Sequence, residues 1–305
     1  MVKVFKWIAG IIGVLLVVAV IGIAVMIVIA QPRPDHPFFA NLPDHDVLIL
    51  AHQGGDGEFP GNTLYAFEQA TALGVDVLEM DVHSSADGTI MVIHDDTVDR
   101  TTDASGRVNE LTVTELQALD AGYHWPTLGG HPLSDSGEYP YRGQGITIPT
   151  LEEIFQAFPD MPMSVEIKQE TPSIAQTLCG LIRQYEREDL TIVPSFRTGA
   201  MQEFRDVCPE VATAGVEPEV IAFFAWSYVG LGSAWQPTTE SFMVPEYQGD
   251  LQVISARFVN QLQAQNVAIY PWTINDSQQM QRMIDLGVDG LITDYPTQAL
   301  ALLGR

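Results

Sequence analysis

Cysteine is scarce in this 305-residue chain. Its two cysteines, Cys179 and Cys208, are too few and too far apart in sequence to suggest a cysteine-rich zinc site or a fold built on disulfides. The chain is long enough to bury a sizeable hydrophobic core. We therefore expect a core-stabilised domain in which these two residues are buried thiols, in preference to a disulfide.

Positive charge is also scarce. Residues 34–305 contain all 39 acidic residues of the chain and only 11 basic ones, a net charge of −28. Such an acidic surface repels nucleic acid and offers no polybasic patch to anionic lipids, so we expect neither as a partner. Lys168 is the single lysine of this region, and its neighbours in the fold should explain why it is there.

Charge is absent altogether from residues 7–30, an apolar run long enough to cross a bilayer as a helix. We predict a transmembrane anchor over residues 1–30, with a cleaved signal peptide as the alternative because Val28–Ala30 resembles a cleavage site. Lys3 and Lys6 precede the run, so the positive-inside rule places the N-terminus in the cytoplasm. The following domain is then expected on the extracytoplasmic side.

Beyond the anchor, a proline-rich segment precedes a regular alternation of elements. Residues 31–45 predict an extended, semi-rigid linker. From residue 46 to 305, apolar strand-like runs alternate with helical patterns, which is typical of a parallel sheet covered by helices. The predicted fold class is α/β, a TIM-type (β/α)8 barrel, with an open doubly wound sheet as the alternative. Strands are expected at 47–51, 76–82, 89–94, 163–167, 190–194, 210–214, 267–272 and 290–293, while the strand-like segment 242–245 finds no place among them.

Two segments interrupt the alternation. Residues 95–149 are polar and rich in turn signals, and we predict a small inserted subdomain there. Residues 220–237 are aromatic and nearly uncharged. They predict either a buried helix with its loop, or an apolar lip that receives a lipid chain or touches a bilayer.

Acidic side chains occur in an unusual position, within predicted strands. Glu79 and Asp81 are two residues apart and therefore share one face. On an interior face they need a cation or a proton between them, whereas on an edge strand they would simply be solvated. A later strand brings Glu166 and, on the same face, Lys168. Three carboxylates converging at the carboxyl ends of barrel strands suit one divalent cation, Ca²⁺ or Mg²⁺.

Two histidines end neighbouring predicted strands. His52 follows the first strand and His94 follows the third, so both are expected at the same end of the barrel as the carboxylates. Imidazoles titrate near neutrality and can serve as a proton acceptor and a proton donor on opposite sides of a phosphorus centre. A cation beside Lys168 would attract an anion such as a phosphate diester.

Seven motifs follow one another along the chain: AHQGG…PGNT (51–63), DVLEMDVHSSADGTIMVIHDDTVDRTTDASG (76–106), ELQALDAG (115–122), IPTLEEIF (148–155), VEIK (165–168), PWTIND (271–276) and GVDGLITDYP (287–296). In this order they resemble the glycerophosphodiester phosphodiesterase family, whose fold is a barrel like that of phosphatidylinositol-specific phospholipase C. The resemblance covers residues 47–303, nearly all of the predicted domain. It also identifies 95–149 with the inserted subdomain of that family.

The resemblance implies roles for individual residues. Glu79, Asp81 and Glu166 match the metal ligands, His52 and His94 the acid/base pair, Lys168 a phosphate-neutralising residue, and Trp272 a substrate-contacting position. Two positions depart from the family pattern. Gln53 stands where the family has arginine, which removes a bidentate phosphate contact although Gln53 remains a candidate substrate-binding residue, and Gly61 stands where it has glutamate.

The expected activity is metal-dependent hydrolysis of glycerophosphodiesters to glycerol phosphate and an alcohol. The resemblance implies that a cyclic phosphate forms first and is then hydrolysed, with the two histidines exchanging roles. Trp272 could stack on the glycerol or hold a choline by cation–π attraction. Two alternatives are open: a lysophospholipase D that acts on membrane lysophospholipids, and a barrel that binds head groups without turnover.

Overall fold

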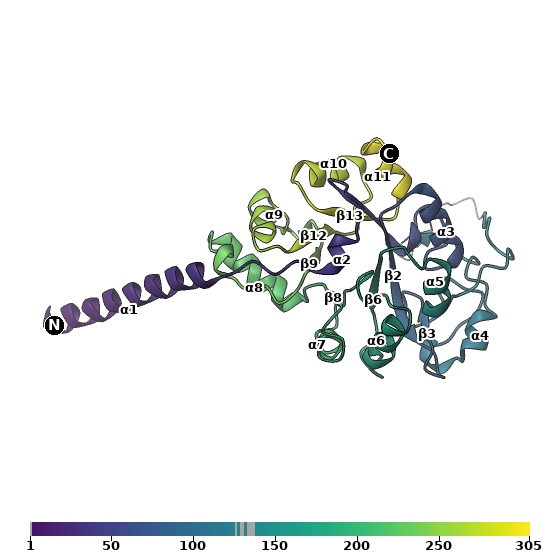
Figure 1. Ribbon diagram of the computed structural model, residues 1–305, viewed down its shortest axis with the longest axis horizontal. Helices are drawn as coiled ribbons and strands as arrows, with labels where there is room; N and C mark the ends of the chain where they lie inside the picture. The colour runs from purple at the N-terminus through teal and green to yellow at the C-terminus, as the bar shows by residue number, and fades with distance from the viewer. Residues whose placement is uncertain (1, 126, 129–130, 133–137) are drawn as a thin grey trace.

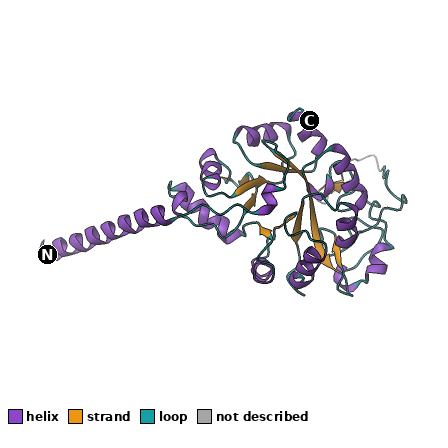
Figure 2. Ribbon diagram, viewed as in Figure 1, coloured by secondary structure: helices purple, strands orange, loops and turns teal. Residues whose placement is uncertain are grey.

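A computed structural model describes residues 2–125, 127–128, 131–132 and 138–305. Its main body is a sheet wrapped by helices, and a long N-terminal helix projects from one side (Figure 1). The sheet lies inside and the helices outside (Figure 2). The predicted arrangement of a parallel sheet covered by helices is therefore confirmed.

Eight parallel strands of the described chain form the barrel wall. The strand order runs from β13 through β1, β2, β6 and β7 to β8, and each neighbouring pair is parallel. A parallel bridge from Ala214 to Ser241 leads on to β9, which pairs with β12. Hydrogen bonds from Asp289 N to Ile269 O and from Ile274 N to Ile292 O connect β12 back to β13. The strands are β1 (Leu48–Ala51), β2 (Val77–Ser84), β6 (Met163–Ile167), β7 (Thr191–Val193), β8 (Ala212–Thr213), β9 (Ser241–Val244), β12 (Ala268–Pro271) and β13 (Gly290–Thr293).

A helix follows each of these strands, as a TIM-like barrel requires. The largest apolar cluster fills the layer between strands and helices, with Phe67, Phe155 and Phe204 among its fully buried side chains. The helices are α3 (Leu64–Leu73), α5 (Leu151–Ala157), α6 (Ala175–Gln184), α7 (Thr198–Val207), α8 (Glu217–Tyr228), α9 (Ala256–Gln263), α10 (Ser277–Asp285) and α11 (Pro296–Leu302).

One predicted barrel strand is wrong. The segment 89–94 forms β3 (Ile90–Val92), which pairs antiparallel with β2 and lies outside the barrel wall. The turn at Asp87 and Gly88, where Gly88 has φ +82°, folds the chain back as a hairpin and so excludes the parallel pairing. The unplaced segment 242–245 belongs to β9 and supplies the missing parallel strand.

The predicted inserted subdomain shares a small core with β3 and Ile93. Met91, Ile93, Val108, Leu116 and Ile148 are buried together in a cluster separate from the barrel core. The segment includes a 3₁₀ turn (Val108–Glu110), α4 (Val113–Gln117), β4 (Thr127–Leu128) and β5 (His131–Pro132). Part of the prediction, at residues 126, 129–130 and 133–137, lies outside the described residues.

Residues 31–45, for which we predict an extended linker, include a short helix and pack against the barrel. The short helix α2 (Pro37–Ala40) packs Phe38 against Ile192 of β7 and Ala212 of β8, where its side chain is buried. Arg33 N donates to Gln265 O, and the Arg33 side chain pairs with Glu240. The buried Phe38 side chain and the salt bridge of Arg33 therefore hold the segment against the barrel.

The expectation of two free thiols is also wrong, because Cys179 and Cys208 form a disulfide. Cys179 lies in α6 and Cys208 follows α7, two helices that pack side by side. Their separation of 29 residues gave no sign of this proximity. The bond ties two neighbouring helices of the outer layer together.

The N-terminal helix α1 (Val2–Ile29) exposes apolar side chains, including Trp7 and Val14. In the part of the chain that the structure describes, no helix combines the length and the hydropathy needed to cross a membrane. The transmembrane helix predicted for residues 1–30 is therefore not supported.

Candidate active site

The three predicted acidic residues meet at the carboxyl ends of β2 and β6. Glu79 and Asp81 project from the same face of β2, and the parallel register places Glu166 of β6 directly beside Asp81. One carboxylate oxygen from each lies within 4.8 Å of the other two. All three residues are buried, so the edge-strand alternative, in which the acids are solvated, is wrong.

Concentrated negative charge makes this cluster costly in the absence of a cation. Burial and the neighbouring Asp81 raise the pKa of Glu79 to about 8, and burial also raises the pKa of Glu166 against the pull of Lys168. Lys168 Nζ lies 3.0 Å from Asp81 Oδ1 and 2.8 Å from Glu166 Oε1. Burial raises the pKa of Asp81, but Lys168, the two histidines and the Asn62 hydrogen bond together outweigh it, and the net shift is downward. One ammonium thus offsets part of the charge of three carboxylates.

The donor set fits a hard divalent cation. Asp81 Oδ1 and Glu166 Oε1 are buried, and within the described chain they have no hydrogen-bond partner beyond their ion pairs with Lys168. Because the donors are all oxygens, Ca²⁺ or Mg²⁺ suits them better than zinc. The other group of possible metal ligands in the described chain is Cys179, Cys208 and Glu210, and its two sulfurs are bonded to each other.

Two residues with left-handed backbones hold the carboxylates in place. Asn62 (φ +57°) donates from Nδ2 to Asp81 Oδ2 at 2.8 Å and accepts from Asp81 N. Gln53 (φ +53°) donates its backbone N–H to Glu79 Oε2 at 3.0 Å. The Gln53 side chain is buried with Nε2 3.5 Å from His52 Nε2. Gln53 therefore orients Glu79 through a backbone contact that needs no arginine.

A carboxylate binds the Nδ1 side of the His52 ring. Its Nδ1 lies 2.5 Å from Asp294 Oδ1, and Asn275 donates to Asp294 Oδ2 at 2.6 Å. Its Nε2 is 4.0 Å from Glu79 Oε2, so this nitrogen faces the acidic cluster. Burial lowers the pKa of His52, but Glu79 and Asp294 outweigh it and raise the pKa to about 10.

His94 has an equivalent partner but a more open position. Its Nδ1 lies 2.7 Å from Asp95 Oδ1, and Arg100 donates from Nε to Asp95 Oδ2 at 2.7 Å. Burial raises the pKa of Asp95, but the bonds from His94 and Arg100 outweigh it and hold that pKa well below its usual range. The His94 side chain is 40% exposed, compared with 22% for His52.

A cavity of about 740 Å³ joins these groups to an apolar region. His52, Glu79, His94, Glu166 and Lys168 form its polar end. Most of the remaining lining is apolar. It includes Phe196, Val220, Ile221, Phe224, Met243, Leu251 and Trp272.

The predicted substrate-contacting residue Trp272 lies in this cavity wall. Its ring packs edge-on against Phe196, with the ring centroids 5.3 Å apart. Lys168 Nζ is 5.7 Å from the centroid of the Phe196 ring. The charged group of Lys168 therefore lies next to an aromatic wall formed by Phe196 and Trp272.

The departure at Gly61 has a local cause. A Cβ at position 61 would collide with the carboxylate of Asp56, whose Oδ1 accepts a hydrogen bond from Gly61 N at 3.1 Å. Asp56 is buried, and burial together with Asp294 raises its pKa to about 6. Glu58 accepts hydrogen bonds from Thr297 instead. The buried acid beside Gly61 is therefore Asp56.

Comparison with protein families agrees with this geometry. The model of the glycerophosphoryl diester phosphodiesterase family matches residues 52–298, which include both histidines and all three acidic residues. The chain belongs to this family. The match also explains why seven separated motifs appear in one order.

Curated relatives span most of the chain. A glycerophosphodiester phosphodiesterase from Caldanaerobacter subterraneus subsp. tengcongensis is 31% identical over 85% of this chain and 98% of its own length. A lysophospholipase D from Homo sapiens is 27% identical over 82% of this chain and 83% of its own length.

Solved structures share the fold. The glycerophosphoryl diester phosphodiesterase domain of an uncharacterized Mycobacterium tuberculosis protein superposes with a TM-score of 0.74 at 22% identity, covering 85% of this chain and 100% of that domain. An Oleispira antarctica phosphodiesterase in complex with the product sn-glycerol-3-phosphate gives a TM-score of 0.67 at 23% identity, covering 88% and 99%. At these identities the likeness establishes a common TIM-barrel-like architecture.

Sequence reasoning missed the residues that orient the site. Asp294, Asn275, Asp95, Arg100 and Asn62 all lie inside motifs that resemble the family, but no role was inferred for them. Each is an ordinary polar residue of a loop by sequence alone. For Asp95 a signal was present, since it directly follows His94. For Asp294 none was, because 242 positions separate it from His52.

We predict that Asp294→Asn lowers kcat on a glycerophosphodiester by about 100-fold and leaves KM nearly unchanged, because the amide no longer holds the His52 ring with its Nε2 toward the acidic cluster. Steady-state kinetics with circular dichroism as a folding check would measure this. Asp285→Asn, on α10, is the matched control. An unchanged kcat would show that Asp294 does not position His52.

We predict that Asp56→Asn stabilises the fold at high pH only. The Asp56 pKa is raised from 3.8 to about 6, so folding favours the protonated carboxyl, and this contribution is lost as pH rises through 6. The Asp56→Asn variant carries a neutral amide that avoids the loss, gaining about 3 kcal/mol at pH 8 and almost nothing near pH 4. Urea unfolding at several pH values tests this, with exposed Asp250→Asn as the control. A gain of the same size at every pH would contradict it.

Proposed function

We propose that this chain hydrolyses glycerophosphodiesters to glycerol phosphate and an alcohol with the help of one divalent cation. The observation that carries the proposal is that the cluster of Glu79, Asp81 and Glu166 adjoins a single cavity, which Glu79, Glu166 and two carboxylate-bound histidines line. Membership in the family and the names of its curated members support the same reaction class.

Glu79, Asp81 and Glu166 would hold the cation, Ca²⁺ or Mg²⁺. When bound, it supplies Lewis-acid polarisation of a phosphate oxygen and lowers the pKa of a coordinated hydroxyl. Asn62 and the backbone of Gln53 keep two of the three carboxylates in place. Lys168, already paired with Asp81 and Glu166, neutralises the charge of the phosphate diester.

The two histidines divide the proton transfers. With Nδ1 engaged by Asp294 or Asp95, each ring presents Nε2 to the substrate. One accepts the proton of the glycerol 2-hydroxyl as that oxygen attacks phosphorus, and the other protonates the departing alcohol. Water then opens the cyclic phosphate while the histidines exchange roles.

Trp272 and Gln53 act on the substrate less directly. The edge-to-face pair of Trp272 and Phe196 offers an aromatic wall for the glycerol or for a quaternary ammonium head group. The buried side-chain amide of Gln53, next to His52, would contact the phosphate of the substrate. The compensation for the missing arginine would come from Lys168 and the cation.

A second candidate activity is that of a lysophospholipase D. A small water-soluble head group would not need the apolar part of the cavity, which is lined by Val220, Ile221, Phe224 and Leu251. Its size and lining suit an acyl chain. A curated relative from Homo sapiens carries the name lysophospholipase D.

The decisive assay measures choline release from glycerophosphocholine and from lysophosphatidylcholine, each with Ca²⁺, Mg²⁺ or chelator. We expect metal-dependent release and a loss of about 1000-fold in Glu79→Gln, because a buried ligand charge is removed. Glu58→Gln, whose parent side chain bonds only to Thr297 within the described chain, is the matched control. Preference for the second substrate would select the lysophospholipase D activity. Metal-independent binding of both without release would leave a head-group-binding barrel.

We further propose that the catalytic domain is extracytoplasmic and is attached to a membrane through residues 7–30. The disulfide between Cys179 and Cys208 supports an oxidising compartment. The uncharged apolar sequence of residues 7–30, preceded by Lys3 and Lys6, supports attachment with the N-terminus in the cytoplasm.

This topology predicts that Asp250→Cys in the full chain, expressed in bacterial cells, reacts with a membrane-impermeant maleimide before lysis. The native cysteines do not compete because they are paired. A cysteine placed at position 2 is the control and should react only after lysis. Labelling of position 250 only after lysis would place the domain in the cytoplasm.

A further inference from the structure

Helix α8 is apolar on two opposite sides. On its inner side Phe223 is fully buried and packs edge-on against Trp235, Phe242 and Phe258. Its outer side, at spacings of four and three residues, carries Ile221, Ala225 and Tyr228, all exposed. Ile221 is 60% exposed and Tyr228 72%. Helices of soluble domains usually place polar residues on such a face.

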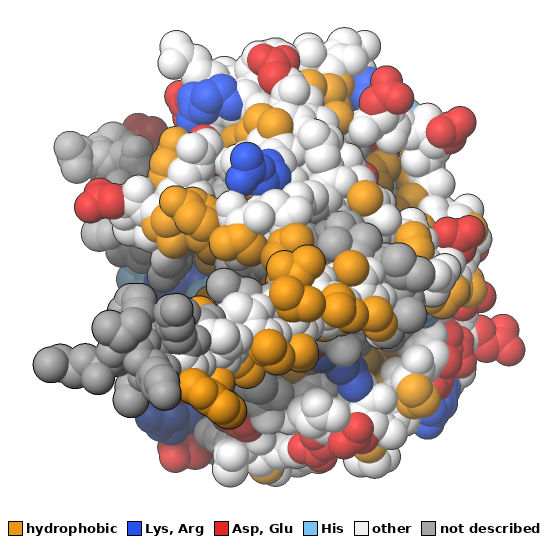
Figure 3. Space-filling model, turned by 90° about the vertical axis from the view of Figure 1, so that its left-hand side faces the viewer, with side chains coloured by type: hydrophobic (Ala, Val, Ile, Leu, Met, Phe, Trp, Pro, Cys, Tyr) orange, Lys and Arg blue, Asp and Glu red, His pale blue; other side chains and the backbone are white. Residues whose placement is uncertain are grey.

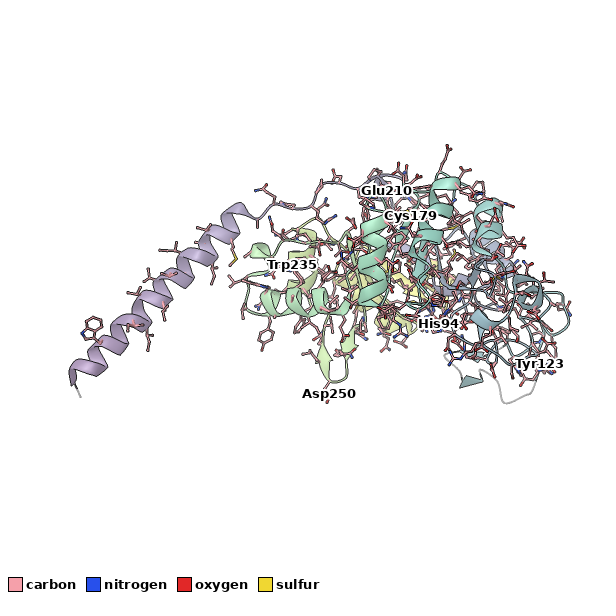
Figure 4. The ribbon with its side chains drawn as sticks, turned by 90° about the horizontal axis from the view of Figure 1, so that it is seen from below. His94, Tyr123, Cys179, Glu210, Trp235 and Asp250 are labelled. Carbon is pink, nitrogen blue, oxygen red and sulfur yellow. A yellow bond between two sulfur atoms is a disulfide. The ribbon has the colours of Figure 1, made fainter. Side chains whose placement is uncertain are left out.

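The neighbouring hairpin extends this apolar area. Strands β10 (Tyr247–Gln248) and β11 (Leu251–Gln252) form a short antiparallel pair with Asp250 at its tip. Tyr247 and Leu251 are each about half exposed. Figure 4 shows the hairpin projecting beside α8, with Asp250 pointing away from the barrel. We call the exposed residues of both elements the α8–hairpin surface, formed by Ile221, Ala225, Tyr228, Val229, Tyr247 and Leu251.

This concentration of apolar side chains is local. Outside α1, nine large apolar side chains of the described residues are exposed, and five of them belong to the α8–hairpin surface. A sixth, Phe196, lies at the cavity. Figure 3 views the molecule from the side on which α1 projects, so the exposed apolar side chains of α1 lie in front of that face. Such clusters mark an interaction site more often than chance exposure does.

The surface is continuous with two other features. Ile221 and Leu251 belong both to it and to the lining of the cavity that contains His52 and His94. At its other end, α8 leads into a 3₁₀ turn (Gly232–Ala234) that lies beside α1. The apolar area therefore runs from the N-terminal helix to the opening of the catalytic cavity.

We propose that the α8–hairpin surface rests on a layer of zwitterionic phospholipid, so that a lipid substrate passes from the layer into the cavity without crossing water. The inference rests on the proposed function of the cavity. Apolar side chains flanked by Tyr228 and Tyr247 suit the boundary between head groups and acyl chains. The net charge of −28 over residues 34–305 disfavours anionic lipid and selects a layer without net charge.

Site-specific labels test the contact directly. The native cysteines are paired, so Tyr228→Cys and Tyr247→Cys can each carry one environment-sensitive fluorophore in the full chain. In phosphatidylcholine vesicles with a spin label just below the head groups, we expect quenching at both positions at least about threefold stronger than at Leu73→Cys, an exposed leucine of α3. Equal quenching at the three positions would overturn the proposal. A spectral shift that follows protein concentration, without lipid quenching, would indicate a second copy and also overturn it.

A kinetic comparison provides the second arm. The double variant Tyr228→Asp and Val229→Asp changes two side chains outside the cavity lining. We expect it to hydrolyse lysophosphatidylcholine in vesicles about tenfold more slowly and glycerophosphocholine at the parent rate, whereas Leu73→Asp changes neither. Unchanged rates on both substrates would contradict docking.

The two proposals fail in different ways. If the parent chain releases choline from neither substrate, the proposed function fails, and lipid quenching at positions 228 and 247 still decides the docking. If the double variant loses both activities, circular dichroism identifies misfolding, and the labelled variants again decide.

Discussion

The buried negative charge of Glu79, Asp81 and Glu166 is the constraint on which the rest of the site depends. Three carboxylates this close repel one another, and burial removes the water that would otherwise solvate them. Neighbouring groups of the protein offset this negative charge. Lys168 offsets part of it, Asn62 and the Gln53 backbone donate to it, and the oxygen donors that remain suit a cation.

The two histidines stand in unequal environments. His52 and its partners Asp294 and Asn275 belong to the barrel itself, from the ends of β1 and β13 and the loop after β12. His94, by contrast, is oriented by Asp95 and Arg100, which open the inserted subdomain. One histidine of the proposed proton-transfer pair is thus fixed by the barrel and the other by the segment inserted into it. Changes within the subdomain can therefore alter His94 while leaving His52 untouched.

Local periodicity was sufficient for much of the fold and of the site. The spacing of two in strands placed Glu79 with Asp81 and Glu166 with Lys168, and the alternation of elements predicted the barrel. What failed depends on contacts distant in sequence. The hairpin at β3, the burial of Phe38, and the bond between Cys179 and Cys208 are decided by packing against segments that local patterns do not identify. The same holds for Asp294, which approaches His52 from the far end of the chain.

The packing of residues 33–45 against the barrel has a mechanical consequence. Arg33 is bonded to Gln265 and Glu240, and Phe38 packs against Ile192 and Ala212, so only a few residues connect α1 to the part of the chain held by the barrel. The segment between α1 and Arg33 is therefore the main place where the direction of α1 can change. With Arg33 and Phe38 held, α1 keeps a restricted direction relative to the side of the barrel from which it projects.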